Sequence, residues 1–379
     1  MEIPILKIPF DADDAQFITE ELKDILLKGR LAMGEHTREF EERFAGFCGC
    51  GQALACANGT AALEMICRAL EVAGGSVAVP ALTFMATALA PVAAGAKIIL
   101  IDCDPHTFQM DPEDLAQKIR SDTRAVILVH LGGFISPHLE RLKKIAESSG
   151  ATLVEDAAHA HGAEIGGRKA GNLGLAGAFS FYPTKVLTTA EGGMVTTSDQ
   201  ALADKLRWLR QHGQEKPGSN LHQHFGLNYR PSEIHSLLGL AMMRKAMWIL
   251  DRRRQAAARY DELLKGSPLR PVRAPEGQKP AYYKYMALLP EGLNRDRLKA
   301  RLKEEHQISL AGEVYARTLA SQPYFKNYSQ TLASPLVPLP VSEMAASRQI
   351  CLPLYPGLKE DEQAYVVDKV LKIIESEKK

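Results

Sequence analysis

The chain has 379 residues, of which 46% are hydrophobic and 24% are charged, and its formal net charge is +1. This length and composition allow one large and one smaller globular domain. Lysines and arginines are scattered rather than arranged as a basic stripe, which excludes a nucleic-acid partner held by bulk charge.

The six cysteines lack the paired CxxC spacing of a metal site, and the chain is too long to need a disulfide framework. We therefore expect reduced cysteines and no metal at Cys48-Gly49-Cys50. No apolar run approaches the roughly 20 residues of a membrane span, and the first ten residues lack the features of a signal peptide. We expect a cytoplasmic protein with no membrane contact.

The first clear helical pattern lies in residues 36–47, where three phenylalanines recur at helical spacing. An apolar run over residues 53–57 then meets Asn58-Gly59-Thr60, and the pattern after it predicts a helix that starts near Thr60. Free backbone N–H groups and the helix dipole at such a start suit a phosphate group. An ordinary capped helix is the alternative.

Four short runs rich in Val, Ile and Leu follow, at residues 76–80, 97–102, 125–130 and 151–156. Continuous apolar runs predict parallel strands that are covered on both faces. Helical patterns lie between them, and Ser136-Pro137 predicts an N-cap and first residue of one helix. This is an α/β architecture, in which ligands bind beyond the carboxyl ends of strands. Asp102, His130 and Asp156 fall at such ends.

The most informative stretch begins at Asp156 and ends at Lys185. Residues 178–182 form another predicted strand, and Ser180 precedes Lys185 by five residues. Together these side chains could hold pyridoxal 5′-phosphate (PLP): Asp156 at the pyridine nitrogen, Ser180 at the phosphate and Lys185 at the aldehyde carbon. Phe84 follows the strand at 76–80 and could stack on the cofactor ring, although core packing is the commoner role of such a residue.

A helix is predicted from 199 to 212, and a polar turn at 226–233 precedes a long helical stretch from 232 to 264. After a segment rich in glycine and proline, residues 282–289 predict a strand, and 295–306 and 361–377 predict helices. We expect a large PLP-binding α/β domain, with an N-terminal helical segment, at residues 1–250. Residues 251–379 are expected to form a small α+β domain.

These motifs resemble the DegT/DnrJ/StrS family of sugar aminotransferases, a branch of the fold-type I PLP enzymes. The resemblance spans nearly the whole chain and is densest from Gly34 to Met243. It implies a mostly parallel sheet of the seven-stranded type in the large domain. The residues that carry it include Asn58-Gly59-Thr60, 80–87, 102–105, Val129-His130-Leu131, 155–159, 179–185, Glu191-Gly192-Gly193 and 226–230.

The resemblance implies a role for each matching position. Lys185 would bond to the cofactor's aldehyde carbon, and Asp156 would keep the pyridine nitrogen protonated. His159 would lie near the ring hydroxyl, and Phe84 over the ring. The phosphate of the cofactor would be held by Gly59, Thr60, Ala61 and Ser180 of the same chain and by Asn228 of a neighbouring chain. That last contact implies a homodimer with shared active sites. His130, His161 and Glu191 are expected to be structural.

Three positions depart from the family pattern. Gly74-Gly75-Ser76 replaces the usual Gly-Asp-Glu turn, and Ala190 stands before Glu191-Gly192-Gly193 where the family has glycine. Where the family has a His-Tyr pair facing the sugar, this chain has Val314-Tyr315. Tyr315 is therefore the expected substrate contact.

The resemblance implies transfer of an amino group, with L-glutamate as the expected donor, to a keto sugar carried on a nucleotide. Such a reaction serves surface polysaccharide or secondary-metabolite synthesis. The alternatives are a PLP-dependent sugar dehydratase, a keto-cyclitol aminotransferase and a non-catalytic PLP-binding regulator. The presence of Lys185 argues against the dehydratase, because the relevant relatives carry histidine there.

Overall fold

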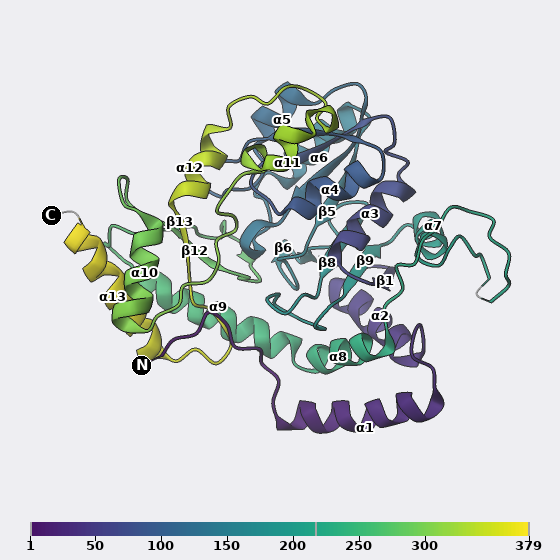
Figure 1. Ribbon diagram of the computed structural model, residues 1–379, viewed down its shortest axis with the longest axis horizontal. Coiled ribbons are helices and arrows are strands. Elements are labelled where there is room, and N and C mark those ends of the chain that lie inside the picture. Colours follow the sequence, from purple (N-terminus) through teal and green to yellow (C-terminus); the bar gives the residue numbers. More distant parts are fainter. Residues whose placement is uncertain (1, 217, 378–379) are drawn as a thin grey trace.

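The structure is a computed structural model that describes residues 2–216 and 218–377 (Figure 1). A seven-stranded sheet with the strand order β1-β9-β8-β5-β4-β2-β3 forms its centre. Its strands are β1 (Gln52–Cys56), β2 (Ser76–Pro80), β3 (Lys97–Ile101), β4 (Thr123–Val129), β5 (Thr152–Asp156), β8 (Ala176–Ser180) and β9 (Gly193–Thr197).

The sheet is mostly parallel, as predicted. The pairs β2–β3, β2–β4, β4–β5 and β5–β8 are parallel, and only β9 runs against its neighbours β1 and β8. Both faces are covered, because alternate residues of one strand enter different cores: in β2, Ala78 belongs to one buried cluster, and Val77 and Val79 belong to another. This explains why the strands read as continuous apolar runs.

Helices cover both faces of this sheet. Phe40 and Phe44 of α2 belong to the first cluster, and α3 and α4 supply the second. The helices of this part are α1 (Ala12–Lys28), α2 (Glu35–Cys48), α3 (Gly59–Ala69), α4 (Met85–Ala93), α5 (Pro112–Lys118), the 3₁₀ turn η1 (Leu131–Gly133), α6 (Leu139–Ser148) and α7 (Gln200–Arg210).

Two expected helix boundaries are wrong. The stretch 232–264 forms two helices, α8 (Glu233–Arg244) and α9 (Ala246–Leu263), because Lys245 between them has non-helical dihedral angles. Lys245 forms ion pairs with Asp11 and Asp14 at the start of α1, a tertiary contact that a local pattern does not encode. Likewise, α6 begins at Leu139 rather than at Ser136-Pro137, which form the preceding turn.

A third buried cluster lies in the C-terminal part of the chain, on the left of Figure 1, where α9 and α13 pack beside a three-stranded sheet of order β10-β12-β13. Its elements besides α9 are β10 (Arg270–Pro271), β12 (Tyr285–Leu288), α10 (Arg295–His306), β13 (Gln349–Leu352) and α13 (Glu360–Glu377). The connection from α10 to β13 packs on the large sheet instead, because Leu319 and Phe325 belong to the second cluster and Ala345 to the first; it contains η2 (Leu319–Ser321), α11 (Pro323–Asn327), η3 (Ser329–Thr331) and α12 (Pro340–Arg348).

A third sheet links the two parts of the chain. It pairs β11 (Gln278–Lys279) with β6 (Glu164–Ile165), which in turn pairs with β7 (Arg168–Lys169). The proposed domain boundary between residues 250 and 251 falls inside α9 and remains a prediction. Among the described residues, no helix has both the length and the apolar content needed to cross a membrane.

Candidate active site

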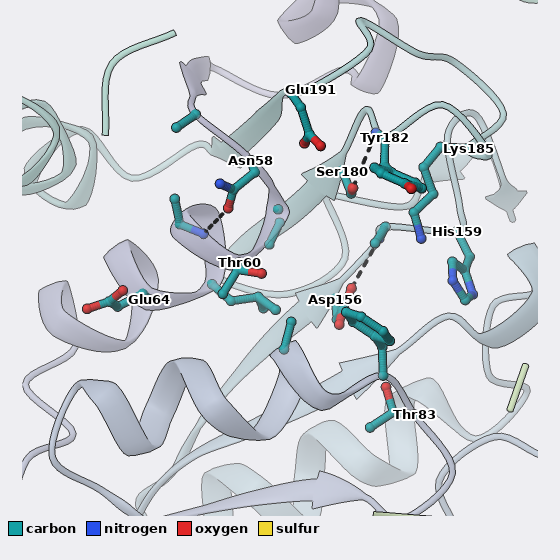
Figure 2. A pocket seen from close by; sticks show the side chains of 18 of the residues that line it. Asn58, Thr60, Glu64, Thr83, Asp156, His159, Ser180, Tyr182, Lys185 and Glu191 are labelled. Atoms are coloured by element: carbon teal, nitrogen blue, oxygen red, sulfur yellow. Dashed lines mark hydrogen bonds between the residues drawn. The ribbon is translucent and has the colours of Figure 1, made fainter. Parts of the chain in front are cut away.

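A cavity of about 630 Å³ opens where β5 and β8 end and α3 begins (Figure 2). Because β5 and β8 are parallel neighbours, their carboxyl ends meet at the same edge of the sheet. All ten side chains or backbone positions singled out from the sequence line this cavity, namely Gly59, Thr60, Ala61, Phe84, Asp156, His159, Ser180, Lys185, Asn228 and Tyr315.

The N-terminus of α3 forms one wall. Asn58 caps the helix by accepting a 2.9 Å hydrogen bond from the Ala61 amide, whereas the amides of Gly59 and Thr60 have no acceptor within the described part of the chain. A Cβ atom on Gly59 would lie 2.8 Å from the Cβ of Ser180, so only glycine lets the end of β8 approach this closely. Two free amides beside two hydroxyls make a site for a phosphate dianion.

Asp156 lies at the floor, at the end of β5. Its carboxylate accepts hydrogen bonds from Thr87 Oγ1 at 2.7 Å and from the Ala158 amide at 3.2 Å. Burial nevertheless raises the pKa of Asp156, because removal from water disfavours the charged form more than these bonds and the nearby Lys185 favour it. A buried carboxylate of this kind is stabilised by a cationic partner, such as a protonated pyridine nitrogen.

Lys185 reaches the cavity from the loop that follows β8, as Figure 2 shows. Burial lowers the pKa of Lys185 to about 8, and the positive charge of Lys284 adds to this effect, while Asp156 opposes it. About a tenth of this amine is therefore neutral at pH 7, far more than of an ordinary lysine, and this fraction can act as a nucleophile or a base.

His159 is held from three sides. Tyr315 Oη lies 3.1 Å from its Nε2, the Gly132 amide lies 3.4 Å from its Nδ1, and the ring of Tyr283 stacks on it. Burial keeps the pKa of His159 well below its ordinary value, so the ring is neutral. Since Nδ1 accepts from Gly132, the hydrogen-bond network places the ring proton on Nε2, which donates to Tyr315.

Tyr315 and Phe84 share the mouth of the cavity. Their ring centres are 5.8 Å apart, and Phe84 is 58% exposed. An exposed aromatic ring at this place is free to contact a bound molecule rather than the core. Asn228 is also exposed on this rim, where its side chain accepts a hydrogen bond from the Arg230 amide.

Two other polar residues at strand ends lie outside the cavity. Asp102 accepts hydrogen bonds from the amides of Val341 and Ser342 and thereby caps α12. Nε2 of His130 lies 2.8 Å from Oε2 of Glu155, and both side chains are fully buried. A structural role for His130 remains a prediction, with which this burial agrees.

Several other residues line the cavity. Glu191, which we expected to be structural, is one of them, and Thr83, which follows β2, and Tyr182, which follows β8, were assigned no role from the sequence. Thr83 lies within the motif at 80–87 that carried the family resemblance, so a signal was present. Tyr283 comes from the C-terminal part of the chain, and nothing local in its surroundings indicated a site.

A family model described as the DegT/DnrJ/EryC1/StrS aminotransferase family matches residues 12–371. The chain belongs to this family. Its members are PLP-dependent sugar aminotransferases, so the predictions of family, fold class, enzyme type and cofactor are confirmed. The free α3 amides, the buried Asp156 and the adjacent Lys185 fit that cofactor.

The relatives of this DegT-family chain include an enzyme and a protein named as a regulator. It is 34% identical to the UDP-N-acetyl-3-dehydro-alpha-D-glucosamine 3-aminotransferase of Acidithiobacillus ferrooxidans, over 90% of this chain and 89% of that one. It is 33% identical to a pleiotropic regulatory protein of Geobacillus stearothermophilus, over 98% of both chains. The structure of S. venezuelae DesV, in complex with a ketimine intermediate, has a TM-score of 0.90, 29% identity and 99% coverage of both chains.

Proposed function

We propose that this aminotransferase moves an amino group from L-glutamate to a keto sugar carried on a nucleotide. The observation that carries the proposal is the joint placement of Lys185, Asp156 and the free α3 amides around one cavity. The A. ferrooxidans relative is named as an aminotransferase for a UDP-linked dehydro sugar, and this supports the substrate class.

Each role follows from position. PLP, when bound, supplies an electron sink for the carbanion that forms at the donor's α-carbon. The Gly59 and Thr60 amides and the Ser180 hydroxyl would hold its phosphate, and Asp156 would keep its ring nitrogen protonated. Lys185 would hold its aldehyde carbon and, as a neutral amine, would serve as the base that accepts the proton from the donor's α-carbon.

Absorption spectroscopy tests the donor. We expect the PLP-loaded protein to absorb at about 420 nm and to convert, on addition of L-glutamate alone, to a form that absorbs at about 330 nm. The product 2-oxoglutarate should appear in equal amount. If glutamate leaves the spectrum unchanged and another amino acid converts it, that amino acid is the donor and glutamate is not.

The acceptor is tested with a panel of nucleotide-linked 3-keto and 4-keto sugars and a keto-cyclitol, offered to the aminated enzyme. Return of the initial spectrum with a nucleotide sugar supports the proposal. Return with the cyclitol alone would make the protein a keto-cyclitol aminotransferase.

The name of the G. stearothermophilus relative favours one further candidate, a PLP-binding regulator. Spectral conversion by an amino donor excludes a non-catalytic regulator. A Lys185→Ala protein supplied with pyridoxamine phosphate separates transamination from dehydration, because an aminotransferase without this lysine should not turn over. Full activity in that variant would overturn the assignment of Lys185.

We further propose a cytoplasmic homodimer in which Asn228 serves the partner's cofactor phosphate. Asn228 is exposed in the connection between α7 and α8, where it pairs with Gln211, and it lies on the rim of the cavity, within reach of a neighbouring chain. If the sites are shared, co-expression of Lys185→Ala and Asn228→Ala chains gives mixed dimers with one intact site. About a quarter of all sites would then be active. No restored activity would place Asn228 in its own chain's site.

A further inference from the structure

Tyr283 makes three contacts in the active-site cavity. Its ring stacks on His159 with centroids 4.1 Å apart and an interplanar angle of 27°. The Nζ atom of Lys185 lies 4.8 Å from the centre of the same ring. Its hydroxyl lies 3.0 Å from Thr184 Oγ1, the residue that immediately precedes Lys185. One side chain from the C-terminal part of the chain therefore contacts both residues that we place at the reacting end of the cofactor.

The backbone that carries Tyr283 is held in an unfavourable conformation. Tyr282 has a φ of +47°, which is rare for a bulky residue. The Arg253 guanidinium, buried beneath it, donates 2.9 Å hydrogen bonds to the carbonyl oxygens of both Tyr282 and Tyr283. Burial lowers the pKa of Arg253 to about 10, so this cation is placed there at a free-energy cost. Costly features of this kind persist where the surrounding structure fixes them, and they concentrate at functional sites.

A pair of glycines connects the same turn to His159. Gly133 O accepts from the Ala281 amide at 2.9 Å, and a Cβ atom on Gly133 would lie 2.9 Å from the Tyr283 nitrogen. Gly132, its neighbour, contacts Nδ1 of His159. The turn at Tyr282-Tyr283 and the imidazole are thus fixed to one another through a single backbone segment at the end of β4.

We propose that Tyr283 is a positioning residue, whose ring and hydroxyl hold Lys185 and His159 in the arrangement that the reaction requires. A free lysine side chain has four rotatable bonds, and restricting them places Nζ at the reacting carbon for a larger share of the time. The ring also shields Nζ from water. This inference rests on the assignment of Lys185 in the proposed function.

The test separates binding of PLP from its covalent capture. Apoprotein is mixed with PLP, total bound cofactor is measured by equilibrium dialysis, and cofactor fixed on Lys185 by borohydride is measured by peptide mass spectrometry. For Tyr283→Leu we expect total binding within about twofold of the original protein, because the phosphate site and Asp156 remain, and a fall of about tenfold in the initial rate of capture. Tyr283→Phe should restore most of that rate. Tyr328→Leu, at an exposed position, is the control.

The hydroxyl contact is tested by a double-mutant cycle. Tyr283→Phe and Thr184→Val each remove the same hydrogen bond, so the double variant should capture PLP at the rate of either single variant. Additive losses, or no loss in any of the three, would overturn the positioning role of the hydroxyl. If Tyr283→Leu does not fold, this cycle still tests the contact by which the Tyr283 hydroxyl positions the segment that carries Lys185.

A folded Tyr283→Leu protein that captures PLP as fast as the unsubstituted protein would overturn the positioning role of the ring. That result leaves the proposed function intact, provided that borohydride fixes the cofactor on Lys185. If the unsubstituted protein is fixed at another residue, the assignment of Lys185 fails first, and the role of Tyr283 fails with it.

Discussion

The Thr87 hydroxyl donates a 2.7 Å hydrogen bond to Oδ2 of Asp156, and the hydroxyl oxygens of Thr83 and Thr87 are 2.8 Å apart. Because a hydroxyl has one proton, Thr83 must donate to Thr87 when Thr87 donates to the carboxylate. This chain of two hydroxyls stabilises the charged form of Asp156, whose pKa burial raises.

Substitution of Thr87 tests this relationship. Thr87→Val should raise the pKa of Asp156 further and weaken its hold on the protonated ring nitrogen. We expect PLP affinity to fall about tenfold, which corresponds to the loss of about 1.4 kcal/mol of hydrogen bonding to a charged group. Equilibrium dialysis with PLP measures it. Thr83→Val, one step removed, should have a smaller effect, and equal effects in the two variants would contradict the chain of hydroxyls.

The ionisation of Lys185 should be visible in the pH dependence of PLP capture by the apoprotein. The amine must be neutral to attack, so the capture rate should rise with pH and level off above about pH 8, the lowered pKa of Lys185. A free lysine would give a midpoint near its ordinary pKa of about 10.4. Stopped-flow absorbance between pH 6 and 10 measures the midpoint.

Lys284 supplies part of that shift, after burial. Lys284→Gln removes its positive charge, so the pKa of Lys185 should rise and the midpoint of capture should move to higher pH, by about half a unit. Lys284→Arg keeps the charge and should leave the midpoint in place. A midpoint that is the same in all three proteins would leave burial as the only cause.

The contact between Gly59 and Ser180 predicts a loss of cofactor affinity. Gly59→Ala would place a Cβ atom 2.8 Å from Ser180 Cβ and 3.2 Å from its Cα, and so separate the two sides of the phosphate site. We expect PLP affinity to fall at least tenfold and the apoprotein to lose about 1–3 kcal/mol of stability, because the end of β8 must move. Equal loss of affinity in Asn58→Ala, which removes only the helix cap worth about 1 kcal/mol, would point to capping instead.

Two helical glycines should respond in opposite directions to alanine. A Cβ atom on Gly239 of α8 would lie 2.6–2.8 Å from the ring of Phe40, so Gly239→Ala should destabilise the protein by about 1–3 kcal/mol. Gly46 of α2 has nothing within 4 Å of its Cβ position, so Gly46→Ala should stabilise it by about 0.5–1 kcal/mol. Thermal unfolding of the apoprotein measures both; stabilisation by Gly239→Ala would show that α2 and α8 can separate at little cost.

The sequence by itself determined the α/β class, the positions of several strands along the chain and the residues that carry the candidate site. The predicted strand at 76–80 coincides with β2, and the helix expected near Thr60 begins at Gly59. These features are local, since apolar runs and turn residues specify them within a few positions. The convergence of Asp156, Ser180 and Lys185 followed because parallel strands bring their carboxyl ends to one edge.

Only the tertiary structure decided the rest. The break between α8 and α9 depends on ion pairs from Lys245 to α1, more than 200 residues earlier in the chain. Tyr283 reaches Lys185 from almost 100 residues away, through a turn that Arg253 and Gly133 hold in place. Contacts of this kind join side chains whose local sequences carry no mark of one another, and packing alone selects them.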